Sequence, residues 1–285
     1  SSTWNKVSTI YYWNGSAWKE SFTGGFVITK TFNSGQTSNF NIASEATAAG
    51  WDGSTIIIAN LTIPSGGYLG SSSTSTYALE TALMVAGSTV NLTLNSGGFL
   101  VGRGGAGGAG ADASITTGST GGNGGSALNV ISGITFNLTN NGTIGGGGGG
   151  GGGGNGGADW FTEGNYNGGP GGGGPGFGTG GPRTIAVRTA QVGTSFAAAN
   201  GTHNAGGAGL QSLLVSGEAN NGSSGGTGGS GGSLGSTGNT GLNNGSGAVA
   251  TYNSGSPGGA AGVAINGWSR ITVGTEGTIL GAKNN

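Results

Sequence analysis

Hydrophobic and polar residues alternate in short stretches that recur along the chain. The clearest copies span residues 90–102 and 134–145, and related copies span residues 57–70 and 271–281. Each copy pairs an alternating stretch, rich in β-branched residues, with an Asn/Gly turn and a second short apolar stretch. Alternation with a period of two is typical of strands that bury one face. The repeat therefore predicts a platform of half-buried β-strands.

Residues 1–32 form a segment of different composition, rich in aromatic side chains. An Asn14-Gly15 pair between two strand-like stretches predicts a β-hairpin there. So short a segment cannot bury all its rings by itself, and they form either the core of a small β-domain or a docking face. The rings are those of Trp4, Tyr11, Tyr12, Trp13, Trp18, Phe22, Phe26 and Phe32.

One short helix is expected over residues 41–50. Asn41 is a suitable N-cap, the alanines that follow favour helix, and Gly50 is a suitable C-terminal stop.

Glycine makes up 74 of the 285 residues, and two copies of the strand repeat lead straight into glycine runs. Residues 145–154 are all glycine, and Gly-Gly-X triplets occupy residues 104–109, 121–126 and 225–233. A period of three matches the polyproline II backbone, which has three residues per turn and rises about 3.1 Å per residue. In a Gly-Gly-X helix two of the three edges carry no side chain, so neighbouring backbones can approach and hydrogen-bond.

Collagen is the other helix with a period of three. It requires Gly-X-Y with abundant proline, and this chain has Gly-Gly-X and five prolines, which excludes collagen.

The expected fold is mostly β and irregular: a sandwich of stacked polyglycine II helices on a small β-strand platform, with a short N-terminal aromatic β segment. The all-glycine run takes the centre, and the X residues of the triplets face outwards. The expected divisions are an attachment segment (1–32), the platform with its helix (33–101), the glycine sandwich with variable distal loops (102–262) and a C-terminal strand that returns to the platform (263–285).

The direction of the first glycine segments follows from the strand repeat. If the chain leaves the platform through residues 103–110 and returns through 121–126, it leaves again through 145–157. Residues 158–167 then lie at the far end, beside residues 111–120. Beyond Pro170 and Pro175 the direction stays open, because either proline is suited to an extra turn.

Charge and apolar content exclude several classes of partner. Charged residues are 6% of the chain, the net charge is −1 and the arginines are scattered, which argues against nucleic-acid binding. No apolar run approaches the roughly 20 residues of a membrane helix, so membrane insertion is not expected. There is no cysteine for a disulfide or a thiolate metal site.

Signals for catalysis or for a cofactor are weak. His203 is the only histidine, which excludes a cluster of histidine metal ligands. Asp159 and Glu163 share one loop and are conceivable as a glycosidase pair, but such acids more often solubilise a loop. Residues 107–113 match a single calcium-binding β-roll repeat, an architecture that needs tandem copies. We therefore expect no enzyme, no metal and no cofactor.

The segments between glycine runs combine aromatic rings with short polar side chains, the chemistry of adaptable binding loops. The alternative is that some rings fold back over the glycine helices. The candidate binding residues are Trp160, Phe161 and Tyr166, with Asn165 and Asn167 beside them and further contacts from Phe196, His203 and Tyr252.

Strand repeats that run into polyglycine, with aromatic loops between the runs, resemble the receptor-recognition adhesins at the tips of T-even-like bacteriophage long tail fibres. The resemblance covers roughly residues 89–282. Its motifs are Val-Gly-Arg-Gly-Gly at 101–105, Asn-Asn-Gly-Thr-Ile at 140–144 followed by polyglycine, the glycine-rich residues 171–178, and Gly-Gly-Ala-Ala-Gly at 258–262.

That resemblance implies a polyglycine II sandwich, an N-terminal part that fixes it to a tail-fibre protein, and distal loops that bind an outer-membrane protein or a surface glycan. The protein is then expected in the virion, at the fibre tip. The N-terminal third departs from the attachment domain of that family and looks more like β-rich segments of other phage tail proteins. A structural tail or capsid decoration protein, and a glycan depolymerase, remain as alternatives.

Overall fold

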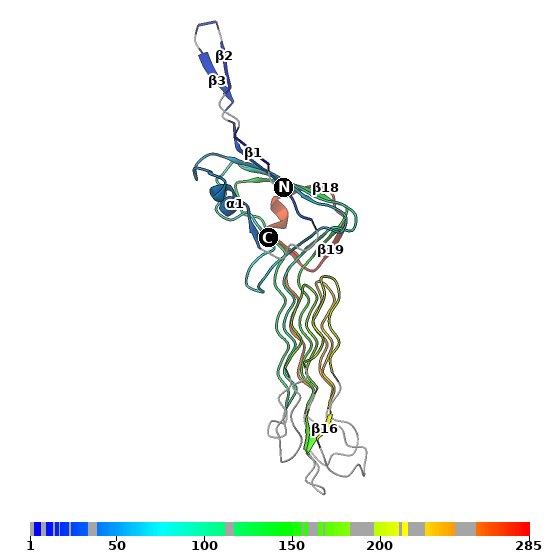
Figure 1. The fold of residues 1–285 in the computed structure, drawn as a ribbon. Helices are drawn as coiled ribbons and strands as arrows, with labels where there is room; N and C mark the ends of the chain where they lie inside the picture. Colours follow the sequence, from blue (N-terminus) through cyan, green and yellow to red (C-terminus); the bar gives the residue numbers. More distant parts are fainter. Residues whose placement is uncertain are drawn as a thin grey trace.

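The structure is a computed structural model that describes residues 3–6, 10–13, 15–16, 18–22, 24–33, 39–111, 117–155, 157–158, 165–167, 169–182, 197–210, 213–215, 226–242 and 255–285. It is mainly β and irregular, with little helix. A β platform lies between an N-terminal hairpin and a long bundle of glycine-rich segments (Figure 1). We call this bundle the glycine array.

Among the described residues, three sheets form the platform. The six-stranded sheet has the order β1 (Thr3–Lys6), β4 (Phe26–Thr31), β6 (Ile57–Ile63), β9 (Thr89–Leu94), β12 (Thr135–Asn140) and β18 (Ile271–Thr275). The four-stranded sheet has the order β19 (Thr278–Leu280), β13 (Thr143–Gly145), β10 (Phe99–Val101) and β7 (Tyr68–Gly70). The five-stranded sheet has the order β20 (Lys283–Asn284), β17 (Ile265–Asn266), β11 (Leu128–Asn129), β8 (Leu79–Glu80) and β5 (Phe40–Asn41).

The chain visits these sheets in the same order again and again, so the platform is a three-sided stack. One coil is β6–β7–β8, the next is β9–β10–β11, then β12–β13–β17, and the last is β18–β19–β20. Within each sheet the strands of successive coils pair in parallel, and β1 pairs with β4 antiparallel. The sequence repeat is thus two sides of one coil, and the predicted strand platform is confirmed.

Alternation along the strands separates a core from an outer surface, as predicted. In β6 every second residue is buried, and the same holds for β9. The inward residues stack across coils, for example Leu61 on Leu92 on Leu138, each at most 1% exposed. Burial of such side chains contributes roughly 1.5–3 kcal/mol each.

In-register parallel pairing also stacks identical polar residues. Nδ2 of Asn91 donates to Oδ1 of Asn60 at 2.9 Å, and Nδ2 of Asn137 donates to Oδ1 of Asn91 at 2.8 Å. On the five-stranded sheet, Nδ2 of Asn266 donates to Oδ1 of Asn129 at 2.8 Å. Each amide offers both a donor and an acceptor, so a column of amides satisfies itself along the stack.

The expected helix is α1 (Ile42–Ala48). Asn41 is its N-cap and accepts a hydrogen bond from the backbone N–H of Ser44 at 2.9 Å. Gly50 follows the helix with φ +95°, a left-handed conformation that favours glycine. A short 3₁₀ helix, η1 (Trp268–Arg270), precedes β18.

The N-terminal segment has two parts. β2 (Ile10–Trp13) and β3 (Trp18–Phe22) form the predicted hairpin, which projects from the platform (Figure 1). Phe26, Ile28 and Phe32, by contrast, are at most 8% exposed and belong to the platform core. The expected boundary after residue 32 therefore moves to the N-terminal side of Phe26, because the last rings of that segment are shared with the stack.

The glycine array is inserted at one corner of the stack. The chain leaves after β10 and re-enters at β11, and it leaves again after β13 and re-enters at β17. Both exits are from the four-stranded sheet, and both returns are to the five-stranded sheet. The array therefore extends from the corner between these two sheets.

Residues 145–154 form the centre of the array, as predicted, and these residues and Asn155 are all buried. Hydrogen bonds recur every third residue: the N–H groups of Gly102, Gly105 and Gly108 donate to the carbonyls of Gly145, Gly148 and Gly151. A Cβ added at any residue from 146 to 154 would overlap a neighbouring carbonyl or proline. Only glycine fits along this run, because other backbones approach it from every side.

Six segments of the described chain surround the central run. It accepts hydrogen bonds from residues 102–111, 226–235 and 256–262 and donates to 119–125, 169–175 and 236–242. The six also bond to one another in a closed ring, in the order 102–111, 119–125, 256–262, 236–242, 226–235 and 169–175. Among the third residues of the Gly-Gly-X triplets, Ala106, Asn123 and Ser233 are exposed, as predicted, and Ala109, Ser126, Thr227 and Ser230 are half-buried.

Successive segments alternate in direction. Residues 102–111 run parallel to the central run and 119–125 run antiparallel to it, which confirms the directions expected from the sequence. Past Pro175 the chain turns at Gly176 and Phe177 (φ +88° and +61°), so residues 176–181 run away from the platform again. The array thus has a proximal end at the platform and a distal end at the far ends of these segments.

Candidate functional site

The distal end carries a small sheet made from two separate connections. β15 (Asn165–Asn167) lies between β14 (Gly157–Ala158) and β16 (Leu213–Val215), antiparallel to both. Tyr166 is opposite Gly157 on one side and Leu214 on the other. The backbone of three predicted site residues, Asn165, Tyr166 and Asn167, is therefore held in the strand shared by both pairings.

Buried polar side chains fasten the connections to the end of the array. Asn155 is 1% exposed, and its Oδ1 accepts a hydrogen bond from the backbone N–H of Gly118 at 3.3 Å. Oγ of Ser256 donates to the carbonyl of Gly118, and the N–H of Ala111 donates to the carbonyl of Gly154 at 3.1 Å. Three connections thus start or end on a common hydrogen-bonded base.

Four predicted site residues, Trp160, Phe161, Phe196 and Tyr252, lie outside the described residues, as do Asp159 and Glu163. The described residues that flank them belong to the distal end. Pro182 and Ala197, which lie before and after the segment that contains Phe196, form an antiparallel β-bridge. Leu242 and Ser256, which flank Tyr252, bond to Asn155 and Gly153 at the end of the central run.

His203 lies at the proximal end, away from the other predicted site residues. Its ring centroid is 4.9 Å from that of Phe99 and 6.0 Å from that of Tyr68, both in the platform. Phe177, from the turn after Pro175, packs edge-on against Tyr68 at 5.4 Å. These four rings form a joint between platform and array, at the opposite end of the array from β15, which holds the backbone of Tyr166.

Tyr68 is the buried member of this joint. It is 7% exposed, and its hydroxyl has no hydrogen-bond partner among the described residues. Burial raises the pKa of the Tyr68 hydroxyl well above its usual range, and the positive charge of Arg103 offsets part of that shift. Sequence reasoning missed the joint. The available signal was that Tyr68 and Phe99 begin equivalent strands of successive coils.

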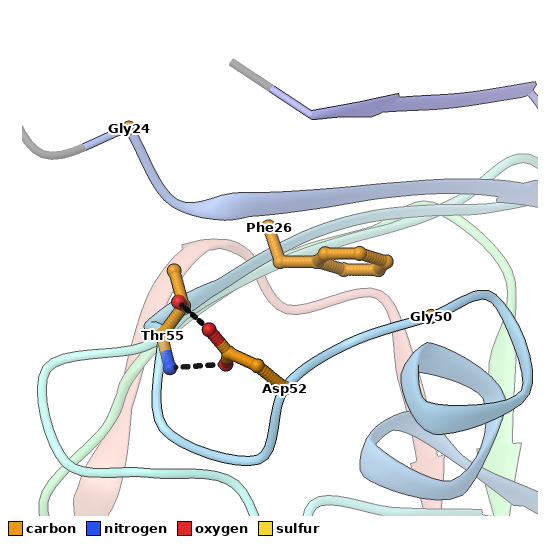
Figure 2. A pocket seen from close by; sticks show the side chains of 5 residues that line it. All are labelled: Gly24, Phe26, Gly50, Asp52 and Thr55. Carbon is orange, nitrogen blue, oxygen red and sulfur yellow. Dashed lines mark hydrogen bonds between the residues drawn. The ribbon is translucent and has the colours of Figure 1, made fainter. Parts of the chain in front are cut away.

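Two hollows lined by described residues lack the features of a ligand site. Figure 2 shows one beside Gly24, Phe26, Gly50, Asp52 and Thr55, with room of about 10 Å³, enough for one water molecule. The Asp52 carboxylate accepts hydrogen bonds from the Thr55 hydroxyl at 2.6 Å and the Thr55 N–H at 2.8 Å (Figure 2). It also accepts one from the Ser54 N–H at 2.9 Å. These bonds hold the pKa of Asp52 well below its usual range. The carboxylate closes a turn.

A larger open groove of about 530 Å³ runs along the flank of the array, lined by small residues that include Asn204, Ser230 and Asn239. Its lining has no charged or aromatic side chain. Within the described part of the chain, no three His, Cys, Asp or Glu side chains group as metal ligands. No helix in that part is long and apolar enough to span a membrane.

Comparisons with known proteins point in one direction. The family model described as phage tail fibre adhesin Gp38 matches residues 27–284. A similar chain occurs in the crystal structure of the gp37–gp38 adhesin tip complex of the bacteriophage S16 long tail fibre. The two are 25% identical, the match covers 90% of this chain and 82% of that chain, and the TM-score is 0.52. No curated protein matches the chain.

Proposed function

The chain belongs to the phage tail fibre adhesin Gp38 family, and on this premise we propose that its distal connections bind a receptor on the bacterial surface. The protein is a receptor-binding adhesin of the virion, at the tip of a phage tail fibre. What is proposed is which part of it makes the contact, with which residues, and to what class of receptor.

The observation that carries the proposal is the position of the connections. The array holds its proximal turns against the platform, and described residues that flank its other connections, such as Ala111, Asn155 and Leu242, meet at the distal end. Loops held at the end of a rigid scaffold are a common location for binding residues. Trp160, Phe161 and Tyr166 are the proposed anchors, with Asn165 and Asn167 as hydrogen-bonding neighbours and Phe196 and Tyr252 as further contacts. His203, which packs in the joint, is left out.

The array itself is proposed to be a sandwich of polyglycine II helices. Support comes from hydrogen bonds that recur every third residue and from a central run with neighbours on all sides. Such packing makes a stiff support, because each backbone is bonded to several others along its length. Stiffness lowers the entropy that the loops lose when they bind.

The proposed receptor is an outer-membrane protein or a surface glycan, and the proposed interaction is binding without catalysis. Aromatic rings with Asn neighbours suit either class, since they combine large apolar area with adaptable hydrogen bonds. Asp159 and Glu163 are proposed to have no role in proton transfer. The N-terminal hairpin is proposed to attach the adhesin to its tail-fibre protein, as the S16 relative was solved in a complex named gp37–gp38.

Adsorption of substituted adhesins to host cells tests the proposal. The triple variant Trp160→Ala, Phe161→Ala and Tyr166→Ala should lose adsorption and keep its melting temperature, because interface anchors commonly contribute about 2 kcal/mol or more each. Asp159→Asn with Glu163→Gln is the matched control in the same connection and should adsorb normally. Normal adsorption by the aromatic variant would contradict the site. Normal adsorption by the carboxylate variant, with loss of glycan release from the cells, would indicate an enzyme.

A further inference from the structure

The described chain joins the platform to the glycine array at one corner only. It crosses between them after β10 and β13 and on its way into β11 and β17. The segments that cross are residues 102–111, 119–125, 145–154 and 256–262. The other described segments of the array, between residues 169 and 242, reach the platform through turns alone. A link at a single corner lets the array pivot unless further contacts hold it.

Three turns at the proximal end supply such contacts. In the first two, the N–H groups of Gly176 and Phe177 donate to the carbonyl of Thr202, at 2.8 and 3.2 Å, which bonds one turn to the other. In the third, the N–H of Ser236 donates to the carbonyl of Ser233 at 3.0 Å. The three proximal turns are residues 176–178, 202–205 and 233–236.

The first two turns cover β7 and β10 of the four-stranded sheet. Phe177 packs on Tyr68 of β7 with the ring centroids 5.4 Å apart, and His203 packs on Phe99 of β10 at 4.9 Å. The next residue of each strand belongs to the platform core, so Tyr68 and Phe99 point to the outer face of the sheet. The four-ring joint therefore lies on that outer face.

The third turn covers the other two strands of the same sheet, β13 and β19. Leu234 is 5% exposed and clusters with residues of β7 and β10, apart from the platform core. It lies on Gly145 of β13, where an added Cβ would be 3.2 Å from the Leu234 side chain. Gly235, with φ +65°, lies against the backbone of Leu280 in β19. Each strand of the sheet thus meets one of the three turns.

Phe177 holds an uncommon backbone conformation in the first turn. Its φ is +61°, which residues with a Cβ rarely adopt and which persists where surrounding contacts impose it. Here the contact of its ring with Tyr68 and the bond from its N–H to Thr202 impose it. A phenylalanine where the backbone favours glycine indicates that the ring itself is needed at this turn.

We propose that the three proximal turns and the four-stranded sheet form a brace that fixes the direction of the array relative to the platform. The joint is the part of the brace that prevents the array from pivoting about the corner. Tyr68, Phe99, Phe177 and His203 are then positioning residues for the distal connections, although they lie at the opposite end of the array. The benefit to receptor binding rests on the proposed function, because a fixed array presents its distal connections in one direction.

Distances between two spin labels on the full chain test the brace. The chain has no cysteine, so Thr139→Cys on the platform and Thr240→Cys on the array, both exposed positions, carry the only labels. Pulsed electron paramagnetic resonance of this labelled parent should give one narrow distribution of label distances. Phe177→Gly with His203→Ala removes two rings of the joint and should widen the distribution about twofold or more, because contacts that restrict a hinge are lost.

The matched control, Phe177→Tyr with His203→Phe, keeps a ring at both positions and should keep the width of the parent. A folded ring-free variant with the parental width would overturn the proposal, even if its melting temperature falls, and so would equal widening in the control. If the ring-free variant does not fold, His203→Ala alone should widen the distribution, and a parental width would overturn the proposal. The labels report on the array without any receptor, so failure of the brace and failure of the proposed receptor site are separate results.

Discussion

Gly150, at the middle of the central run, lies against the carbonyl oxygen of Ala106. The contact is so close that a Cβ added to Gly150 would overlap that oxygen and the backbone that follows it. The N–H of Gly150 meanwhile donates to the carbonyl of Gly122 at 2.9 Å, so the residue is held between two neighbouring segments. Neither neighbour has room to retreat, because each is bonded to others in the ring.

Gly150→Val should therefore cost more than about 3 kcal/mol of unfolding free energy, since a side chain there forces whole segments apart. Thr227→Val is the control, because Thr227 is the outward residue of a Gly-Gly-X triplet and already carries a β-branched side chain. It should change stability by no more than about 0.5 kcal/mol. Denaturant unfolding of both variants measures the difference, and equal stabilities would contradict the packed array.

Substitutions at Phe177 test whether the turn after Pro175 is strained. Its φ of +61° is costly for any residue with a Cβ, while its ring packs against Tyr68. Phe177→Ala keeps the backbone strain and loses the ring, whereas Phe177→Gly loses both. The glycine variant should thus be more stable than the alanine variant by about 1 kcal/mol. The reverse order of melting temperatures would contradict a strained turn.

Tyr68 should make stability fall at alkaline pH. Its pKa is raised in the folded state, so above pH ~10 the unfolded chain loses this proton while the folded protein keeps it. The unfolded state then binds fewer protons, and stability decreases as pH rises, by at most about 1.4 kcal/mol per pH unit.

Tyr68→Phe removes this contribution and should flatten the dependence above pH ~10. At neutral pH the Tyr68→Phe substitution should leave the free energy of unfolding unchanged or increase it, because the hydroxyl is buried without a described partner. Denaturant midpoints measured at several pH values compare the two proteins, and parallel curves would contradict the inference.

Two N-terminal deletions separate attachment from folding. Removal of residues 1–22 takes away β1 and the hairpin and should leave a folded adhesin that no longer joins its fibre. Removal of residues 1–32 also takes away Phe26, Ile28 and Phe32, which are buried in the platform core, and should give an unfolded or insoluble chain. Circular dichroism and thermal melting compare the two, and equal stability would place β4 outside the core.

The sequence by itself determined the parts of this fold that depend on local periodicity. Alternation with a period of two predicts strands wherever it occurs, and the stretches before Gly102 and Gly145 became β9–β10 and β12–β13. A run of glycines has no side chains to bury and packs through its backbone, so residues 145–154 were expected at the centre. Asn41 and Gly50 marked α1, because capping is a property of neighbouring residues.

The tertiary structure decided what depends on contacts between distant residues. The third strand of each coil, such as β11 with Leu128 and Asn129, is two residues long. So short a strand shows no alternation of hydrophobic and polar residues, and the sequence therefore did not predict the third side of the stack. Packing against Tyr68 and Phe99 places His203 at the proximal joint. The composition of the segment around His203 had instead suggested a distal loop. Phe26 and Phe32 looked like their aromatic neighbours in sequence, and only pairing of β4 with β6 put them in the core. The composition of a segment shows that it contains aromatic rings to bury. The pairing of strands that are distant in sequence determines which residues each ring packs against.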